Sequence, residues 1–391
     1  MSENRFVYAD NAATTPVSAA VIEAMMPALT TAWGNPSSQH EKGYEAKALL
    51  DDARRRIAAC LFCTEKEVFF TSSGSEADNW AIRGAAAKNP NKRHIITTKI
   101  EHHAVLHACR RLEREGYRVT YLDVDENGVL HPETLRAAID EETALVAVMM
   151  ANNEIGTLEP IAELSRIAHE FGALMFTDAV QAFGAIPVNP SELGVDLLSI
   201  SGHKLNAPKG IGVLYIRRGV SIANLIEGGG QERRRRGGTE NVAYALGMAR
   251  AMEIALEKLP DMQRVAMLRD RLIDGLLSAV PAAKLNGSRT CRLPGNCNVG
   301  FECIEGESIL MFLDMEGICA STGSACSSDS LEPSHVLLAI GVPHEKAHGS
   351  IRLSLSHDNT EEDVAYILEK LPPIVARLRA MSPIWQENDQ K

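Results

Sequence analysis

The chain has 391 residues, a formal net charge of -11, 45% hydrophobic residues and 23% charged residues. This composition is ordinary for a globular protein in water, and the length suits a large domain with a smaller one. The acidic charge argues against a general nucleic-acid binder, and no apolar run approaches the roughly 20 residues that span a bilayer. The first residues show no signal-peptide pattern, so we expect a cytoplasmic protein.

The eight cysteines do not form a disulfide framework in a chain of this length. Cys60 and Cys63 have the C-x-x-C spacing of redox or zinc sites, but no second pair completes a zinc site. We therefore expect no metal site, and buried or incidental thiols at these two positions and at five others: Cys109, Cys291, Cys297, Cys303 and Cys319.

The first part of the chain alternates between polar segments and amphipathic helices. Residues 11–15 are too polar for a core strand, and we expect them near the active site. Apolar residues at helical spacing predict helices over 17–29 and 44–61. A short strand over 68–71 leads into a helix that begins near Gly74 and Ser75, where backbone N–H groups and a hydroxyl favour an anion. A plain serine N-cap is the alternative, and both can hold together.

From residue 94 onward, apolar strands alternate with helical segments. Strands are expected over 94–98, 117–121, 145–149, 174–178 and 195–200, and 212–216 closes the series. This alternation predicts an α/β fold with a mainly parallel sheet and right-handed crossovers. Beyond 240 the pattern turns helical, with a helix over 268–280 and strands near 298–301 and 351–355. We expect a large domain over 16–259 and a smaller α+β domain made of 1–15 and 260–391.

Two successive strands of this series end in residues that carry chemistry. The strand over 195–200 leads to Lys204, and the strand before it ends in Asp178. Ligand sites of open α/β sheets lie at this edge, where burial could make Lys204 a Schiff-base nucleophile. Considered alone, Lys204 would be interpreted as a surface lysine after a strand, and Asp178 as a cap or turn residue at a strand end. Together they match pyridoxal phosphate enzymes, in which a lysine holds the aldehyde and an aspartate keeps the ring nitrogen protonated.

Several motifs in the same order resemble the class V aminotransferase family, and within it the NifS-like cysteine desulfurases. They lie at residues 10–15, 34–38, 152–156, 177–181, 201–204, 208–212, 321–326 and 331–335. The resemblance implies a fold-type I transferase that uses pyridoxal 5'-phosphate to convert L-cysteine to L-alanine. It also implies a persulfide on Cys326 and sulfur transfer to an acceptor protein for iron–sulfur cluster assembly. Selenocysteine lyase is the close alternative, and a non-catalytic adaptor that kept the fold is another.

The resemblance also implies roles for individual residues. Lys204, His102 and Cys326 are expected to be catalytic, and Asn153 and Arg352 to bind substrate. Thr239 is expected to reach the cofactor phosphate of the neighbouring subunit in a homodimer. The cofactor site is expected to contain Gly74, Ser75, His102, Asn153, Asp178, Gln181, Ser201, His203, Lys204 and Thr239.

The residue types themselves leave alternatives open at several of these positions. His102 could be a satisfied polar histidine at a helix start, and Cys326 an incidental loop cysteine. Arg352, on an apolar strand, could form a structural ion pair with an internal acid instead of binding a carboxylate. The four arginines at 233–236 could form a basic patch, although no aromatic residues interleave them. Two departures from the family pattern are Ser75, in place of threonine, and Ser356 with the residue after it, in place of Gly-Arg.

Overall fold

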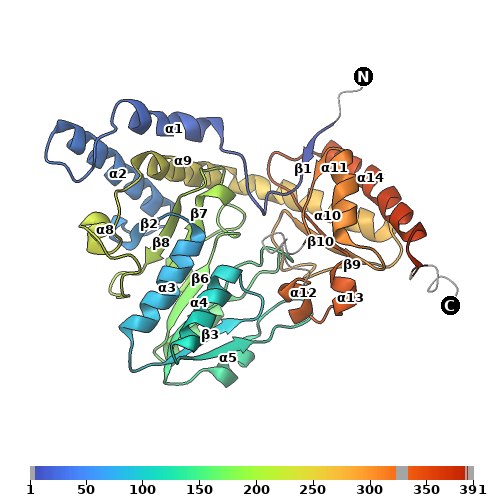
Figure 1. Cartoon of the computed structure of the whole chain (residues 1–391), viewed down its shortest axis with the longest axis horizontal. Coiled ribbons are helices and arrows are strands. Elements are labelled where there is room, and N and C mark those ends of the chain that lie inside the picture. Colours follow the sequence, from blue (N-terminus) through green and yellow to red (C-terminus); the bar gives the residue numbers. More distant parts are fainter. Residues whose placement is uncertain (1–4, 323–332, 384, 386–391) are drawn as a thin grey trace.

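The computed structural model describes residues 5–322, 333–383 and 385, and its centre is a seven-stranded sheet (Figure 1). The strand order is β2-β8-β7-β6-β5-β3-β4. The strands are β2 (Val68–Thr71), β3 (His94–Thr98), β4 (Arg118–Leu122), β5 (Thr143–Ala147), β6 (Leu174–Asp178), β7 (Leu197–Ser201) and β8 (Gly212–Ile216).

The sheet is mainly parallel, as the alternation of strands and helices predicts. Strands β4, β3, β5, β6 and β7 pair in parallel, whereas β8 pairs antiparallel with both β7 and β2. The difference from the expected parallel series lies at β8. Residues 202–211 hold only the short 3-10 turn η2 (Gly202–Lys204) and no crossover helix, so the chain must turn back beside β7.

Helices cover both faces of the sheet, and this explains why its strands appear in the sequence as continuous apolar runs. On one face, α3 (Gly74–Lys88) and α4 (His103–Arg114) pack on alternate strand residues such as Ile95 and Leu145. On the other face, Ile96 and Val146 belong to a larger apolar cluster that also contains residues of α1 (Ala19–Thr30), α2 (Glu41–Cys60), α5 (Pro132–Ala138), α6 (Ile161–Glu170) and α9 (Val242–Lys258). None of the helices in the described ranges is long and apolar enough to cross a membrane.

A separate apolar cluster, which we call the C-terminal core, lies to one side of this sheet (Figure 1). It contains Val265, Phe301, Leu353 and Val364, but also Val7 near the start of the chain. Its strands are β1 (Val7–Tyr8), β9 (Ala283–Leu285), β10 (Asn296–Phe301), β11 (Ile318–Cys319) and β12 (Ser350–Ser354). Its helices are α10 (Met262–Ala279), α11 (Gly306–Met315) and α14 (Glu361–Ala380).

Short helical elements complete the described chain. They are η1 (Glu65–Glu67), α7 (Pro190–Leu193), α8 (Gln231–Arg234), η3 (Leu259–Asp261), α12 (His335–Ala339) and α13 (His344–Ala347).

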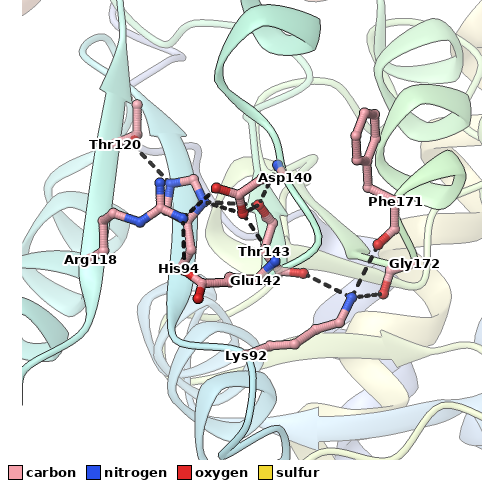
Figure 2. A network of polar contacts seen from close by, with 9 residues as sticks. All are labelled: Lys92, His94, Arg118, Thr120, Asp140, Glu142, Thr143, Phe171 and Gly172. Atoms are coloured by element: carbon pink, nitrogen blue, oxygen red, sulfur yellow. Dashed lines mark hydrogen bonds and ion pairs between the residues drawn. The ribbon is translucent and has the colours of Figure 1, made fainter.

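A polar network fixes the amino ends of β3, β4 and β5 (Figure 2). The ring nitrogens of buried His94 lie 2.8 Å from the hydroxyls of Thr143 and Thr120. Lys92 donates from Nζ to the carbonyl oxygens of Phe171 (3.1 Å) and Gly172 (2.8 Å), which follow α6. Because these parallel strands all start at this edge, the network braces the side of the sheet opposite Lys204 and Asp178.

Candidate active site

One pocket opens at the carboxyl ends of the parallel strands and gathers most of the predicted site residues. It is lined by Lys204 on η2, Asp178 at the end of β6, His102 before α4 and Gly74 at the start of α3. Among the other predicted residues, the lining includes Ser75, Asn153, Gln181, Ser201, His203 and Arg352. Strands that run in parallel end at the same edge, which is why residues far apart in the sequence meet here.

The lysine side chain lies against the polar segment near the start of the chain. Lys204 donates from Nζ to the carbonyl oxygens of Ala12 (2.5 Å) and Ala13 (2.6 Å). Thr15 fixes this segment in place, since its backbone N–H and its hydroxyl both donate to the carbonyl of His203 at 2.9 Å. Ala12 and Ala13 of this segment therefore form a wall of the pocket, close to the position that the sequence predicts.

Asp178 is a buried carboxyl that lines the pocket at the end of β6. Its Oδ1 accepts a hydrogen bond from the backbone N–H of Val180 at 2.8 Å. Burial raises the pKa of Asp178, while that hydrogen bond and the nearby Lys204 act in the opposite direction. A cationic group placed beside this carboxyl in the pocket would therefore gain a strong, desolvated partner.

His102 combines the two roles that the sequence leaves open. Its Nδ1 accepts a hydrogen bond from the backbone N–H of Ala104 at 3.2 Å, which caps α4, and its side chain also lines the pocket. Burial first, and then the charge of Lys204, lower the pKa of His102 to about 4. The imidazole is therefore neutral near pH 7 and can accept a proton from a group in the pocket.

As the pH falls from about 6.5 to about 4, the free energy of unfolding is expected to decrease less in the His102→Gln variant than in the wild type. The wild-type folded state keeps His102 neutral, so the unfolded chain binds the additional proton and acid favours unfolding. Urea unfolding of both proteins across this pH range measures the difference, with the exposed His344→Gln variant as the matched control. Parallel pH profiles for wild type and His102→Gln would contradict the lowered pKa.

The start of α3 has the form of an anion cradle. Ser73 caps the helix, because its hydroxyl oxygen accepts a hydrogen bond from the backbone N–H of Glu76 at 3.1 Å. A Cβ at Gly74 would lie 2.9 Å from Cγ2 of Val180 and 3.2 Å from Cβ of Ser201, so a larger residue would fill the cradle. The helix N-terminus with Gly74 and Ser75 thus lines the pocket beside Ser201, and His203 belongs to the same lining.

Arg352 lies on β12 and reaches the pocket from the C-terminal core. Its Nη2 donates to Oδ1 of Asp10 at 3.1 Å, and its Nη1 donates to the carbonyl of Asn153 at 3.1 Å. The ion pair with an internal acid, one of the two alternatives, is therefore present. The buried Nε of Arg352 has no hydrogen-bond partner in the described part of the chain, which leaves the guanidinium capacity for an anion.

One predicted residue of the described chain does not line this pocket, and another is not among the described residues. Thr239 is exposed and does not line the pocket of its own chain. Cys326 lies outside the described residues. Ser321, a short distance before it in sequence, pairs with Arg352 through two backbone hydrogen bonds of 3.1 and 2.7 Å, so the described chain at Ser321 lies beside a residue of the pocket.

Sequence reasoning missed three buried carboxyls around the pocket. Asp78 accepts a hydrogen bond from the hydroxyl of Ser199 at 2.6 Å. Both carboxylate oxygens of Glu101 accept hydrogen bonds from the backbone N–H of Met149. Glu154 accepts the hydroxyl of Ser334. Burial raises the pKa of Glu101 to about 8 and that of Glu154 to about 7. The available signal for Glu101 and Glu154 was their position, directly beside residues already singled out at 102 and 153, whereas Asp78 lies one turn of α3 after Ser75.

Comparisons with known proteins identify the family of this chain. The family described as Aminotransferase class-V matches residues 7–367. The cysteine desulfurase IscS of Methanosarcina thermophila is 54% identical over 385 residues, which cover 98% of this chain and 95% of that protein. The chain belongs to the class-V aminotransferase family, among its NifS-like cysteine desulfurases.

Solved structures place the fold in the same group of desulfurases. A structure titled "NIFS-LIKE PROTEIN" has a TM-score of 0.90 and 41% identity, and covers 96% of this chain and 100% of its own. A structure titled "SspA in complex with cysteine" has a TM-score of 0.79 and 35% identity, covering 89% and 98% of the two chains. These matches confirm the predicted family and the predicted fold-type I α/β architecture.

Proposed function

We propose that this cysteine desulfurase uses pyridoxal 5'-phosphate to convert L-cysteine to L-alanine, and passes the sulfur through a persulfide on Cys326 to an acceptor for iron–sulfur cluster assembly. The observation that carries the proposal is that Lys204, Asp178 and the start of α3 line a single pocket. The printed names of the relatives and the cysteine in the SspA title support the choice of substrate.

The residues present fit this cofactor. Gly74, Ser75 and Ser201 would hold the phosphate, Asp178 would hold the protonated ring nitrogen, and Lys204 would hold the aldehyde carbon. When bound, the cofactor supplies an electron sink for negative charge that develops at the substrate Cα.

The protein's own residues would carry the remaining steps. The guanidinium of Arg352 would bind the substrate carboxylate, and the amine of Lys204 would remove the proton from Cα. The thiolate of Cys326 would attack the substrate sulfur, so that an S–S bond forms as the C–S bond breaks. Neutral His102 would pass protons between substrate and solvent, and alanine would leave after protonation of its Cβ.

The larger assembly also belongs to this proposal. We propose a homodimer in which the exposed Thr239 reaches the neighbouring subunit's phosphate, and a cytoplasmic location, which suits the free cysteines of the described residues. We propose further that 16–259 forms one domain and that 1–15 with 260–391 forms the other. The C-terminal core supports this division, because its buried members come from Val7, Ala9 and the chain from Val265 onward.

The decisive experiment measures alanine and sulfide released from L-cysteine in the presence of a reductant. Wild-type protein with bound cofactor is expected to release the two products in equal amounts. L-selenocysteine as the second substrate separates the selenocysteine lyase alternative, which predicts a clear preference for selenium. A protein that binds pyridoxal phosphate but releases alanine from neither substrate would overturn the proposal, and a protein unable to bind the cofactor would favour the adaptor.

A further inference from the structure

The four-arginine run at 233–236 is built largely into the fold. Arg233 donates to the carbonyl oxygens of Glu65 (2.9 Å) and Val68 (2.6 Å), and its guanidinium carbon lies 4.1 Å from the ring centre of Phe69. Arg235 donates to the carbonyl of Ile222 at 2.9 Å. Arg234 is exposed. The contacts of Arg233 and Arg235 nevertheless argue against a nucleic-acid patch made of the whole run, and Arg236 has a different kind of partner.

Arg236 forms a two-pronged ion pair with Glu76 at the start of α3. Its Nε donates to Oε1 at 2.8 Å and its Nη2 donates to Oε2 at 2.9 Å, with the two side chains only 20% and 10% exposed. The Glu76 carboxylate also accepts the backbone N–H and the hydroxyl of Ser72, at 2.8 and 2.5 Å. Glu76 lies two residues after Gly74, so this pair adjoins the anion cradle directly.

The backbone that carries Arg236 is held in an unusual conformation. Glu232, Arg233 and Arg234 have left-handed φ angles of 44°, 58° and 65°, which non-glycine residues adopt at a cost unless their surroundings enforce it. Buried Glu232 is anchored by two hydrogen bonds from Arg54, at 2.6 and 2.8 Å. Arg236 therefore reaches Glu76 from a firmly anchored segment.

Two anions compete at this helix start. The N-terminus of a helix stabilises negative charge, and here it would serve both the Glu76 carboxylate and the cofactor phosphate. Without a cation, Glu76 would repel the phosphate. We propose that Arg236 is a positioning residue for the cofactor: it neutralises Glu76, which keeps its contacts with Ser72 while the cradle stays attractive to a phosphate. This inference rests on the proposed cofactor and extends it to a residue that would not touch it.

The proposal predicts opposite effects for the two members of the pair. Arg236→Gln is expected to raise the dissociation constant of pyridoxal phosphate for the apoprotein by about tenfold, the scale of one unit charge a few ångströms away in a partly screened site. Glu76→Gln is expected to lower that constant, and the double variant to return it close to the wild-type value. Titration of each apoprotein with pyridoxal phosphate, followed by absorbance, gives the constants without reference to catalysis.

The neighbouring Arg235→Gln variant is the matched control, because Arg235 contacts a carbonyl away from the cradle, and its binding constant should equal that of the wild type. High salt should shrink the effect of Arg236→Gln, and Arg236→Lys should restore much of the affinity even where Arg236→Gln folds poorly. Weaker binding in both single variants would identify a merely structural pair and overturn the inference, as would an unchanged constant in Arg236→Gln. If wild-type apoprotein itself fails to bind, the proposed function is what fails.

Discussion

Replacement of Lys204 by alanine is expected to abolish covalent attachment of pyridoxal phosphate and to reduce alanine formation by at least about 10⁴-fold. The variant loses both the amine that would hold the aldehyde and the base that would remove the Cα proton. Mass spectrometry after borohydride reduction should detect the cofactor on wild-type protein and not on Lys204→Ala. The alanine assay then measures the catalytic loss on the same samples.

Lys209 provides the matched control for this experiment. It belongs to the same stretch of sequence but is exposed, so Lys209→Ala should retain the covalent cofactor and nearly all activity. Covalent cofactor on Lys204→Ala, or on a different lysine of the wild type, would contradict the role of Lys204.

Replacement of Cys326 by alanine is expected to stop alanine production from L-cysteine while leaving the earlier chemistry intact. The cofactor should remain bound, and exchange of the Cα proton of L-cysteine with deuterated solvent should continue, because Lys204 and Asp178 are unchanged. Alanine should fall at least about 10³-fold, since no other group in the proposed mechanism accepts the sulfur. Proton exchange by nuclear magnetic resonance and the alanine assay separate the two stages.

Cys291→Ala serves as the control, because Cys291 is an exposed free thiol that does not line the pocket. That variant should make alanine at the wild-type rate. Equal alanine production by wild type and Cys326→Ala would show that another group accepts the sulfur, and loss of proton exchange in Cys326→Ala would show a wider disturbance of the site.

The central sheet and the main site residues were predictable from the sequence for a local reason. Each buried parallel strand appears as an apolar run, and the residue after each run must lie at the carboxyl edge of the sheet. This rule brings Lys204, Asp178 and His102 together without any knowledge of tertiary contacts. The family resemblance added the roles, and the comparisons confirmed the family.

Features that depend on distant pairings were not predictable in this way. The acid partner of Arg352 is Asp10, which is 342 residues away in the sequence. The partner of Arg236 is Glu76, and the apolar pattern of β8 does not reveal that it runs antiparallel to β7. Periodicity describes what one segment buries, whereas these contacts depend on which segments become neighbours.

The wall of the pocket that contacts Lys204 has a consequence for the order in which the protein matures. Val7 pairs with Ile318, and Asp10 pairs with Ser354, so the segment that leads into this wall finds partners that are made much later. Closing so long a loop is slow compared with local folding. The strands and helices of the central sheet can assemble first, and the contacts of Thr15 with His203 can form with them, whereas Val7 and Asp10 are fixed only when β11 and β12 have folded. Docking of the C-terminal core should therefore be the late step that completes the pocket, because it also brings Arg352 to Asp10.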